Sequence, residues 1–372
     1  MIFNALLVLS CIYILFLCYL IFGIAQYKQH KIKSNKSTPP VSVIVAVRNG
    51  EDSIAQLLDM LIAQNYSGAM EFVIIDDQSS DNTKEMIERY SATDSRVKYI
   101  DSIDGDDALS FKKRALDAGI KSSSNELLLF TDADCRPNKS WIRNTIETLD
   151  HNTDYQIGMS YVLKKKTLVS RFQSIDFYFL MKAALSIASL KQPNASSGQN
   201  ILYKKSVYNS VNGFSMISNC IQGDDTLFLQ IVKKNTNANV SANDKGYVIG
   251  RTESNWLSFI RQRIRWAGDA NIMWRFNFLF YTMMVCVFFY SFLLVVSGIY
   301  ALYNHSMWNI FFLSITMKFI LEYLFLLTNN SHPQKFSILD FLFWFFIQPF
   351  YIVFVGLGSF VANQIPWRGR VM

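Results

Sequence analysis

The stretch VSVIVAV at residues 41–47 is the first indication of the fold class. It is a short, continuous apolar run after the break at Pro39-Pro40, which is typical of a parallel strand buried on both faces. Residues 51–64 then carry apolar side chains at helical spacing. Beyond them we expect strands at 72–75, 97–100 and 126–130, alternating with helices that begin near Asp81 and Ser110. This alternation with short links predicts an α/β fold with a doubly wound, mostly parallel sheet.

Acidic pairs follow two of these strands. Asp76 and Asp77 come after the second strand, and Asp132 and Asp134 come directly after the strand at 126–130. Ligands of such sheets bind beyond the carboxyl ends of the strands, so we expect both pairs at one edge. The alternating pair Asp132-x-Asp134 suits Mg²⁺ or Mn²⁺ carrying a diphosphate, because hard cations prefer oxygen ligands. Neither GxGxxG nor GxxxxGK[ST] occurs in the sequence, which leaves a Rossmann dinucleotide site and a P-loop unsupported.

Two further motifs follow in the second half of this region. Gly223-Asp224-Asp225 precedes an amphipathic helix, where a carboxylate can either take a proton from a hydroxyl or cap the helix. Gln262, Arg265 and Trp266 have helical spacing and are expected on one helix face. Arg suits a departing diphosphate, and Trp offers a flat surface for a sugar ring. The alternative is a basic, aromatic helix at a membrane surface without a catalytic part.

The order VSVIVAVRN, DDQSSDNT, TDADC, GDD and QRIRW resembles the inverting family 2 glycosyltransferases, which have a GT-A fold. More narrowly, it resembles their membrane-integrated branch with a QxxRW motif, over about residues 40–270. The resemblance implies a nucleotide-sugar donor and a role for each motif residue. Asp76, Asp77 and Lys112 would contact the nucleotide, Asp132 and Asp134 the ribose and the metal-bound diphosphate, Arg265 the donor diphosphate, and Gln262 and Trp266 the acceptor.

The resemblance also places the catalytic base in the GDD segment, at Asp225 or at Asp224. Counting from the glycine favours Asp225, whereas the spacing to the following leucines favours Asp224. The segment Ser197-Gly198-Gln199-Asn200 falls where the family has an acceptor-side turn. The cofactor implied is Mg²⁺ or Mn²⁺.

The two ends of the chain are apolar enough to enter a membrane. The first 27 residues are expected to form a transmembrane helix, since about 20 apolar residues cross the hydrocarbon core. No Lys or Arg precedes this run, and its length does not fit a cleaved signal peptide. Apolar stretches at 278–303, 308–328 and 338–362 predict C-terminal transmembrane helices within residues 276–363. Residues 40–270 would then be the GT-A domain.

Charge indicates the orientation of these segments. Lys28, Lys31, Lys33 and Lys36 follow the first helix and predict a cytosolic domain, most simply at the inner membrane of a bacterium. Three more crossings would put Arg368 and Arg370 outside, so one C-terminal stretch is alternatively re-entrant or interfacial. Residues 168–190 form an amphipathic stretch, either an interfacial helix or a core helix. Lys318 and Glu322, inside the second C-terminal stretch, are either functional or a self-neutralising pair.

Composition narrows the function classes. The chain is 51% hydrophobic and 15% aromatic, and its net charge of +7 suits an anionic membrane surface. Nucleic-acid binding has no supporting motif, and the scattered cysteines suit a reduced compartment. The sequence therefore predicts transfer of a sugar, most simply from a UDP-sugar, to a lipid or lipid-linked glycan. The alternatives are a processive polysaccharide synthase, a non-catalytic nucleotide-sugar-binding protein and a transporter.

Overall fold

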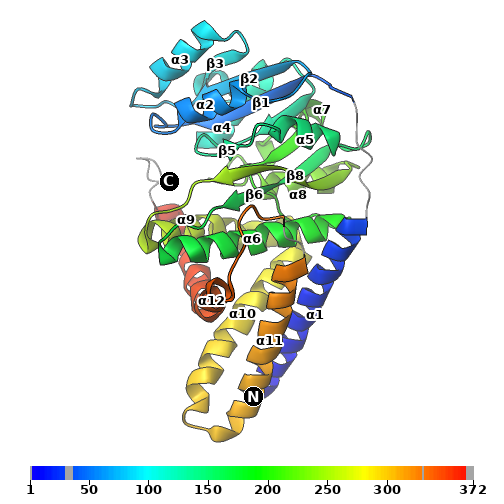
Figure 1. The fold of residues 1–372 in the computed structure, drawn as a ribbon, viewed down its shortest axis with the longest axis vertical. Helices are drawn as coiled ribbons and strands as arrows, with labels where there is room; N and C mark the ends of the chain where they lie inside the picture. Colours follow the sequence, from blue (N-terminus) through cyan, green and yellow to red (C-terminus); the bar gives the residue numbers. More distant parts are fainter. Residues whose placement is uncertain (1, 30–36, 329–330, 366–372) are drawn as a thin grey trace.

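The computed structural model describes residues 2–29, 37–328 and 331–365. An α/β domain forms one end of the molecule, and long apolar helices extend from it to the other end (Figure 1). Two helices, α6 and α9, lie across the base of the α/β domain between these parts.

The predicted parallel strands form one half of the sheet. The described residues contain one eight-stranded sheet, with the order β3-β2-β1-β4-β7-β6-β8-β5. The central strand β1 (Val41–Val47) pairs in parallel with both β2 (Met70–Asp76) and β4 (Leu127–Phe130), and β3 (Val97–Asp101) lies outside β2. The carboxyl ends of these strands therefore meet at one edge, as predicted.

The other half of the sheet is mixed. Strand β7 (Ile201–Lys204) runs antiparallel between β4 and β6 (Tyr155–Val162). Strand β8 (Val240–Gly250) is parallel to β6, and the two-residue β5 (Arg136–Pro137) runs antiparallel to β8. The sheet is thus mostly parallel, with β5 and β7 reversed.

Helices cover both faces of the sheet with apolar side chains. One buried cluster joins the sheet to α2, α3 and α5, and another joins it to α4, α7 and α8. These helices span Ile54–Ile62 (α2), Thr83–Thr93 (α3), Phe111–Ser122 (α4), Trp141–Glu147 (α5), Lys205–Ser210 (α7) and Thr226–Asn235 (α8).

Helix α6 (Leu168–Ser189) is buried on both of its long faces, against β6 and β8 of the sheet and against the apolar helices. Near its end, Ser186 Oγ and Ser189 Oγ donate to backbone carbonyls of α1 (Ile2–Gln29), each over 2.6 Å. Gly23 of α1 permits this approach, because a Cβ there would lie 2.3 Å from Ser186 Oγ. The amphipathic stretch predicted at 168–190 is therefore both a core helix and the contact between the two parts of the molecule.

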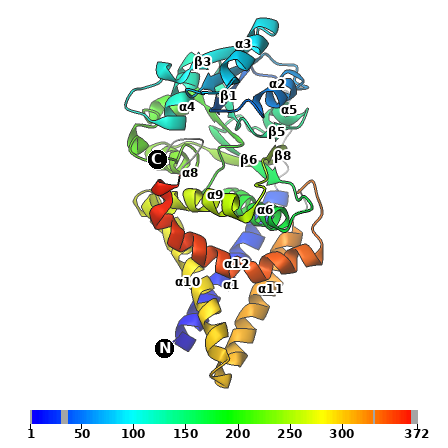
Figure 2. The same cartoon turned by 90° about the vertical axis from the view of Figure 1, so that its left-hand side faces the viewer.

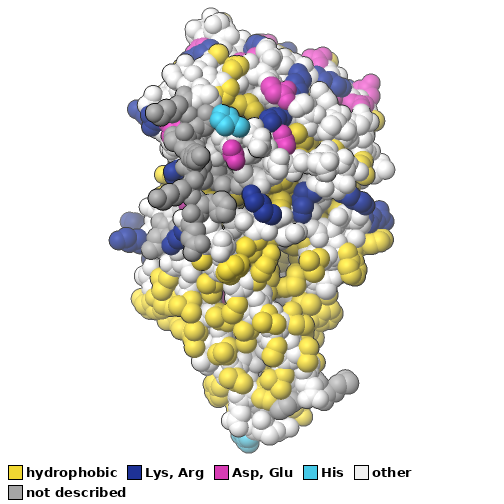
Figure 3. Space-filling model, turned by 90° about the vertical axis from the view of Figure 1, so that its right-hand side faces the viewer, with side chains coloured by type: hydrophobic (Ala, Val, Ile, Leu, Met, Phe, Trp, Pro, Cys, Tyr) yellow, Lys and Arg dark blue, Asp and Glu magenta, His cyan; other side chains and the backbone are white. Residues whose placement is uncertain are grey.

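Four of the described helices are long and apolar enough to cross a membrane. They are α1, α10 (Phe278–Ala301), α11 (Trp308–Thr328) and α12 (Ile338–Gly358). A band of exposed hydrophobic side chains covers this end of the molecule, and a row of Lys and Arg side chains lies where the α/β domain begins (Figure 3). One N-terminal and three C-terminal membrane helices agree with the sequence prediction.

Helix α12 differs from the other three in its direction. Figure 2 shows α12 running obliquely beneath α6 and α9, whereas α1, α10 and α11 extend away from the domain. At the start of α12, Asp340 pairs with Lys164 over 2.8 Å, and after its end Ser359 O accepts from Asn271 Nδ2 over 3.0 Å. The start of α12 thus contacts the α/β domain, and the segment after its end contacts the 3-10 helix Asp269–Arg275 that follows α9. This favours the interfacial alternative for this stretch. Arg368 and Arg370 lie outside the described residues.

The charges inside α11 form a satisfied pair. Lys318 Nζ lies 2.6 Å from Glu322 Oε2, and both side chains are 1% exposed. Tyr13 of α1 donates to the other oxygen of Glu322 over 2.5 Å. The self-neutralising alternative is confirmed, and the pair ties α11 to α1.

Candidate active site

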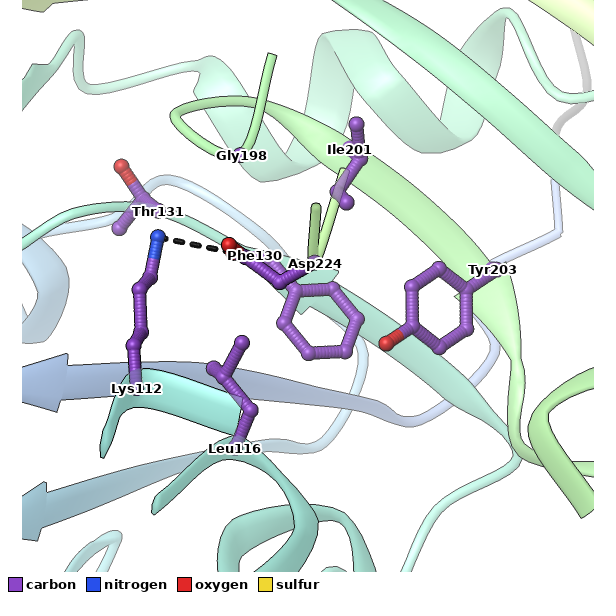
Figure 4. Close-up of a pocket in the computed structure, with 8 residues that line it drawn as sticks. All are labelled: Lys112, Leu116, Phe130, Thr131, Gly198, Ile201, Tyr203 and Asp224. Carbon is purple, nitrogen blue, oxygen red and sulfur yellow. Dashed lines mark ion pairs between the residues drawn. The ribbon is translucent and has the colours of Figure 1, made fainter. Parts of the chain in front are cut away.

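A lysine joins two acidic motifs at the carboxyl edge of the sheet. Lys112, in the first turn of α4, lies 2.9 Å from Asp132 Oδ1 and 2.9 Å from Asp224 Oδ2. Lys112 and Asp224 line a narrow crevice beside Phe130, and Figure 4 shows Lys112 pointing across it to Asp224. Burial alone lowers the pKa of Lys112, but the two carboxylates outweigh burial and raise it well above its usual value. The DxD and GDD motifs, 92 positions apart, therefore share one ammonium group.

Asp225 has a different environment from Asp224. It caps α8 by accepting from Thr226 N, and its Oδ2 accepts from Gly198 N over 2.9 Å. Burial and the neighbouring charge of Asp224 raise the pKa of Asp225 to about 6. The capping alternative is thus confirmed, and it coexists with a carboxyl group tuned toward neutral pH. Such a group is suited to accept a proton from a hydroxyl.

The segment expected to form an acceptor-side turn also braces this carboxylate. Asn200 is buried and accepts from Trp141 Nε1 over 3.0 Å, which fixes the turn that presents Gly198 N to Asp225. A Cβ at Gly198 would lie 3.2 Å from both Asp224 Oδ2 and Lys112 Nζ. Only a residue without a side chain leaves this side of the crevice open.

The first acidic pair lies at the same edge but farther along it. Asp76 ends β2, and Asp77 begins the loop that follows. Two strand spacings separate β2 from β4, so the pair is roughly 10 Å from the DxD motif along the sheet. Asp76 accepts from Ser79 N over 3.1 Å, and Asp77 N donates to Val47 O over 2.7 Å. This distance is appropriate for the far end of a nucleotide.

The DxD motif has the chemistry of a divalent-cation site. Ligand atoms of Asp132, Asp134 and Cys135 all lie within 4.8 Å of one another. Cys135 is buried and offers a soft sulfur, whereas the two partly exposed aspartates offer hard oxygens. The oxygen pair fits Mg²⁺ or Mn²⁺, and the sulfur does not.

The QRIRW motif lies on α9 (Trp256–Gly268), but its three predicted residues diverge. Arg265 lines a cavity beyond Asp224, Gln262 Nε2 donates to Glu253 Oε1 over 3.2 Å, and Trp266 packs on Phe177. Among the residues that the structure describes, neither Gln262 nor Trp266 lines that cavity or the crevice. The shared helix face predicted from their spacing thus does not bring the three side chains to one place.

Three further residues were not identified from the sequence. Arg263, inside the same motif, is 4% exposed and pairs with Asp176 of α6 over 3.1 Å, with its guanidinium 4.4 Å from the ring centre of Trp266. Lys113 is buried and donates to Cys220 O and to Gln222 O, fixing the loop that leads into the GDD motif. Asp269 follows α9, and burial with the charges of Asp225 and Asp224 raises its pKa to about 8. For Asp269, the signal in the sequence was an acidic residue directly after the QRIRWAG stretch.

The structure combines an α/β sheet with a cluster of acidic side chains and one lysine at the carboxyl edge of its parallel strands. The sequence matches the family "Glycosyl transferase family 2" over residues 42–211 and "Glycosyl transferase family group 2" over residues 127–357. The chain therefore belongs to the family 2 glycosyltransferases.

Individual proteins extend the comparison. The sequence is 25% identical over 213 residues to glycosyltransferase AglE of Haloferax volcanii, covering 57% of this chain and 66% of that protein. It is 28% identical over 150 residues to the glucosyltransferase WfgD of Escherichia coli, covering 38% and 55%. The chain thus spans less than two thirds of these relatives. A solved mannosyltransferase of Pyrobaculum calidifontis, PcManGT, shares the fold, with a TM-score of 0.59 at 12% identity over 97% of this chain and 99% of that one.

Proposed function

We propose that the protein transfers a sugar, with inversion, from a nucleotide-sugar to a lipid-linked acceptor at a membrane surface. The observation that carries this proposal is the cluster of Lys112, Asp132 and Asp224 with Asp225 beside it. The cluster sets an ammonium group and the carboxylates of a candidate metal site next to a base. A binding-only protein has no need for a buried carboxyl group with a raised pKa at this position.

The reaction is a single displacement. Asp225 takes the proton of the acceptor hydroxyl, and the oxygen forms a bond to the anomeric carbon of the donor. The bond from that carbon to the diphosphate oxygen breaks, and the electron pair leaves with the nucleoside diphosphate. One displacement inverts the anomeric configuration, so an α-linked donor gives a β-linked product.

The chain's own residues have distinct tasks in this scheme. Lys112 offers positive charge to the diphosphate, Asp76 and Asp77 contact the nucleoside, and Gly198 N keeps the carboxylate of Asp225 in place. Asp132 and Asp134 would hold Mg²⁺ or Mn²⁺, which neutralises charge on the leaving diphosphate.

The donor and acceptor named for one relative suggest which substrates to test first. WfgD is described as using UDP-Glc and α-D-GlcNAc-diphosphoundecaprenol. We propose a UDP-sugar and a polyprenyl-diphosphate-linked sugar of this kind for the present protein. The position of α12 along the base of the domain leaves α1, α10 and α11 as spanning helices among those described, which is a thin wall for a polymer channel. Limited transfer is therefore favoured over processive synthesis.

The lysines that follow the first apolar run support a cytosolic α/β domain by the positive-inside rule. We propose the inner membrane of a bacterium as its location.

A transfer assay in membranes that contain the protein tests this proposal. Radiolabelled nucleotide-sugars are supplied with Mg²⁺ or Mn²⁺, and products are separated into organic-soluble and high-mass aqueous fractions. Metal-dependent label in the organic fraction is expected. Label in a large polymer would instead support a synthase, and bound donor without product would support a binding protein.

A further inference from the structure

A second cavity lies beyond the crevice, on the membrane side of the GDD motif. Its volume is about 260 Å³, and three separate segments line it. They are the loop at 219–222, the corner where α9 meets the 3-10 helix Asp269–Arg275, and the segment Ser359–Gln364 that follows α12. The proposed donor site does not use this cavity.

The lining of the cavity suits a ligand rich in hydroxyl groups or a diphosphate. Asn219, Gln222 and Asn363 carry primary amides, which both donate and accept hydrogen bonds, and Arg265 carries the positive charge. Asp269, which is half-buried, lines the cavity beside them, and its raised pKa of about 8 keeps it mostly neutral at pH 7. A neutral carboxyl group donates a hydrogen bond where a carboxylate cannot.

The cavity also lies next to the proposed base. Asp225 and Asp224 are the charged groups that most strongly raise the pKa of Asp269, and Lys113 is the group that lowers it. Gln222, in the lining, is two residues before Asp224. A hydroxyl group held in the cavity is therefore close to the carboxylate that must take its proton.

An apolar stripe leads from the membrane side into this cavity. Phe346, Phe350, Phe354 and Leu357 of α12 are 59%, 59%, 60% and 60% exposed. Their spacing of three or four residues places them on one face, and Phe360, 78% exposed, continues the stripe and lines the cavity. The stripe is about 20 Å long at 1.5 Å per residue.

The position of the stripe distinguishes it from an ordinary lipid-facing surface. α12 is held at its start by Lys164 of the α/β domain and after its end by Asn271, directly after α9, so the stripe runs along the base of the domain. It connects a hydrocarbon environment to a polar cavity beside the acid pair.

We propose that this cavity binds the polar head of a lipid-borne acceptor while the lipid's hydrocarbon chain lies along the Phe346–Phe360 face of α12. The inference rests on the proposed function and adds the place and the chemistry of the acceptor. Arg265 pairs with the acceptor's diphosphate, and the amides with Asp269 hold the sugar whose hydroxyl group reacts.

The test uses the full-length protein in detergent with two acceptor probes. Both carry GlcNAc-diphosphate, one on an undecaprenyl chain and the other on a short ten-carbon chain. The variant Asn363→Trp fills the polar end of the cavity, and Gln364→Trp, the exposed neighbour that does not line it, is the matched control. Phe350→Ser with Phe354→Ser interrupts the stripe, and Phe312→Ser with Leu313→Ser, 55% and 55% exposed on α11, is its control.

We expect Asn363→Trp to raise the KM for the undecaprenyl acceptor by at least about tenfold, with the donor KM within about twofold of wild type. The stripe variant should lose most of the preference for the long chain, and both controls should keep it. Binding gives a second readout, because the undecaprenyl acceptor should raise the Tm of the wild type but not of Asn363→Trp. Unchanged acceptor KM and Tm response in Asn363→Trp, or equal KM for both chain lengths in the wild type, would overturn the inference.

Failure of the proposed function has a different signature. A wild-type protein that neither hydrolyses nor transfers any labelled nucleotide-sugar would contradict the glycosyl transfer itself. A wild-type protein that hydrolyses the donor, but glycosylates neither probe and shows no Tm response to them, would contradict only the acceptor site proposed here.

Discussion

Replacing Asp225 by asparagine should abolish transfer and at the same time stabilise the folded protein. The carboxyl group has a pKa of about 6 in the folded protein against 3.8 for a free aspartate. The folded state therefore favours the neutral form, and ionisation at pH 7 costs folding free energy. At about 1.4 kcal/mol per pKa unit, the cost is about 2–3 kcal/mol.

The sign follows from proton binding. Between pH 3.8 and about 6 the folded protein binds more protons at this site than the unfolded chain, so its stability falls as the pH rises through this window. Asparagine stays neutral at every pH and still caps a helix well. The Asp225→Asn protein therefore keeps the folding free energy that the wild type loses when Asp225 ionises. At about 2.1 cal/mol/K of unfolding entropy per residue over 372 residues, the expected gain in Tm near neutral pH is roughly 3–4 °C, shrinking toward zero near pH 4.

Transfer and thermal unfolding are measured on the same detergent-solubilised preparation. Activity should fall by about 10²–10⁴-fold, the usual contribution of a general base. Asp224→Asn is the matched control, because it leaves Lys112 with one carboxylate in place of two and should lower the Tm. An Asp225→Asn protein with near-normal turnover, or with a Tm below that of the wild type, would refute this account of the base.

Other expected outcomes concern pH, the metal and two buried cations. The transfer rate should rise about tenfold per pH unit up to about pH 6 and then level, as Asp225 ionises, and a flat profile from pH 4.5 to 7.5 would exclude this titration. Removing divalent cations with EDTA should abolish transfer, Mn²⁺ or Mg²⁺ should restore it, and Asp132→Asn should need more metal for half-maximal rate. Arg263→Met should destabilise by about 3–5 kcal/mol because Asp176 loses its partner, and Asp176→Asn added to it should recover part of that loss in thermal unfolding. Lys113→Met should lower kcat with little change in donor KM, since the loop before the GDD motif loses its anchor, and an unchanged kcat would contradict this role.

The strands from β1 to β4 could be predicted because their signal is local. β1, β2 and β4 each contain an unbroken run of at least four apolar residues followed by a polar one, whereas β3 is shorter and includes Lys98. The helices between the strands keep apolar spacing. Parallel order then fixes where Asp76 and Asp132 lie, without further information. No strand was predicted at β5, β6, β7 or β8. β5 is only two residues long, and the reversed direction of β5 and β7 depends on pairing with partners distant in the chain.

Membrane helices show a different limit. Hydropathy identified α12 as readily as α10, but hydropathy carries no information on direction. The direction of α12 is set by polar contacts at its two ends, Asp340 with Lys164 and Ser359 with Asn271. The sign in the sequence that one C-terminal helix does not cross the membrane was that three crossings would put Arg368 and Arg370 outside, against the positive-inside rule.

Within the site, the sequence predicted which residues gather at the sheet edge, but not which side chains contact each other. The acidic motifs and Lys112 lie together as their order along the sheet implies. In QRIRW, however, the arginine that holds the helix in place is Arg263, and a buried arginine looks the same in a sequence as an exposed one. The burial of Arg263 depends on its partner Asp176 of α6, which lies 87 residues earlier in the chain.

The double burial of α6 also bears on how the protein can be handled. A fragment limited to residues 40–270 would retain α6 but lose α1, α11 and α12, against which one of its long faces packs. Phe172 would lose its contact with Tyr351 of α12, and Phe179 would lose its contacts with Phe325 of α11 and Trp344 of α12. Lys182 would lose the carbonyls of α11 that it now contacts. We expect such a fragment to aggregate or to require detergent. The catalytic unit and its membrane attachment are therefore a single folding unit, and the catalytic part is not a soluble enzyme on a detachable tether.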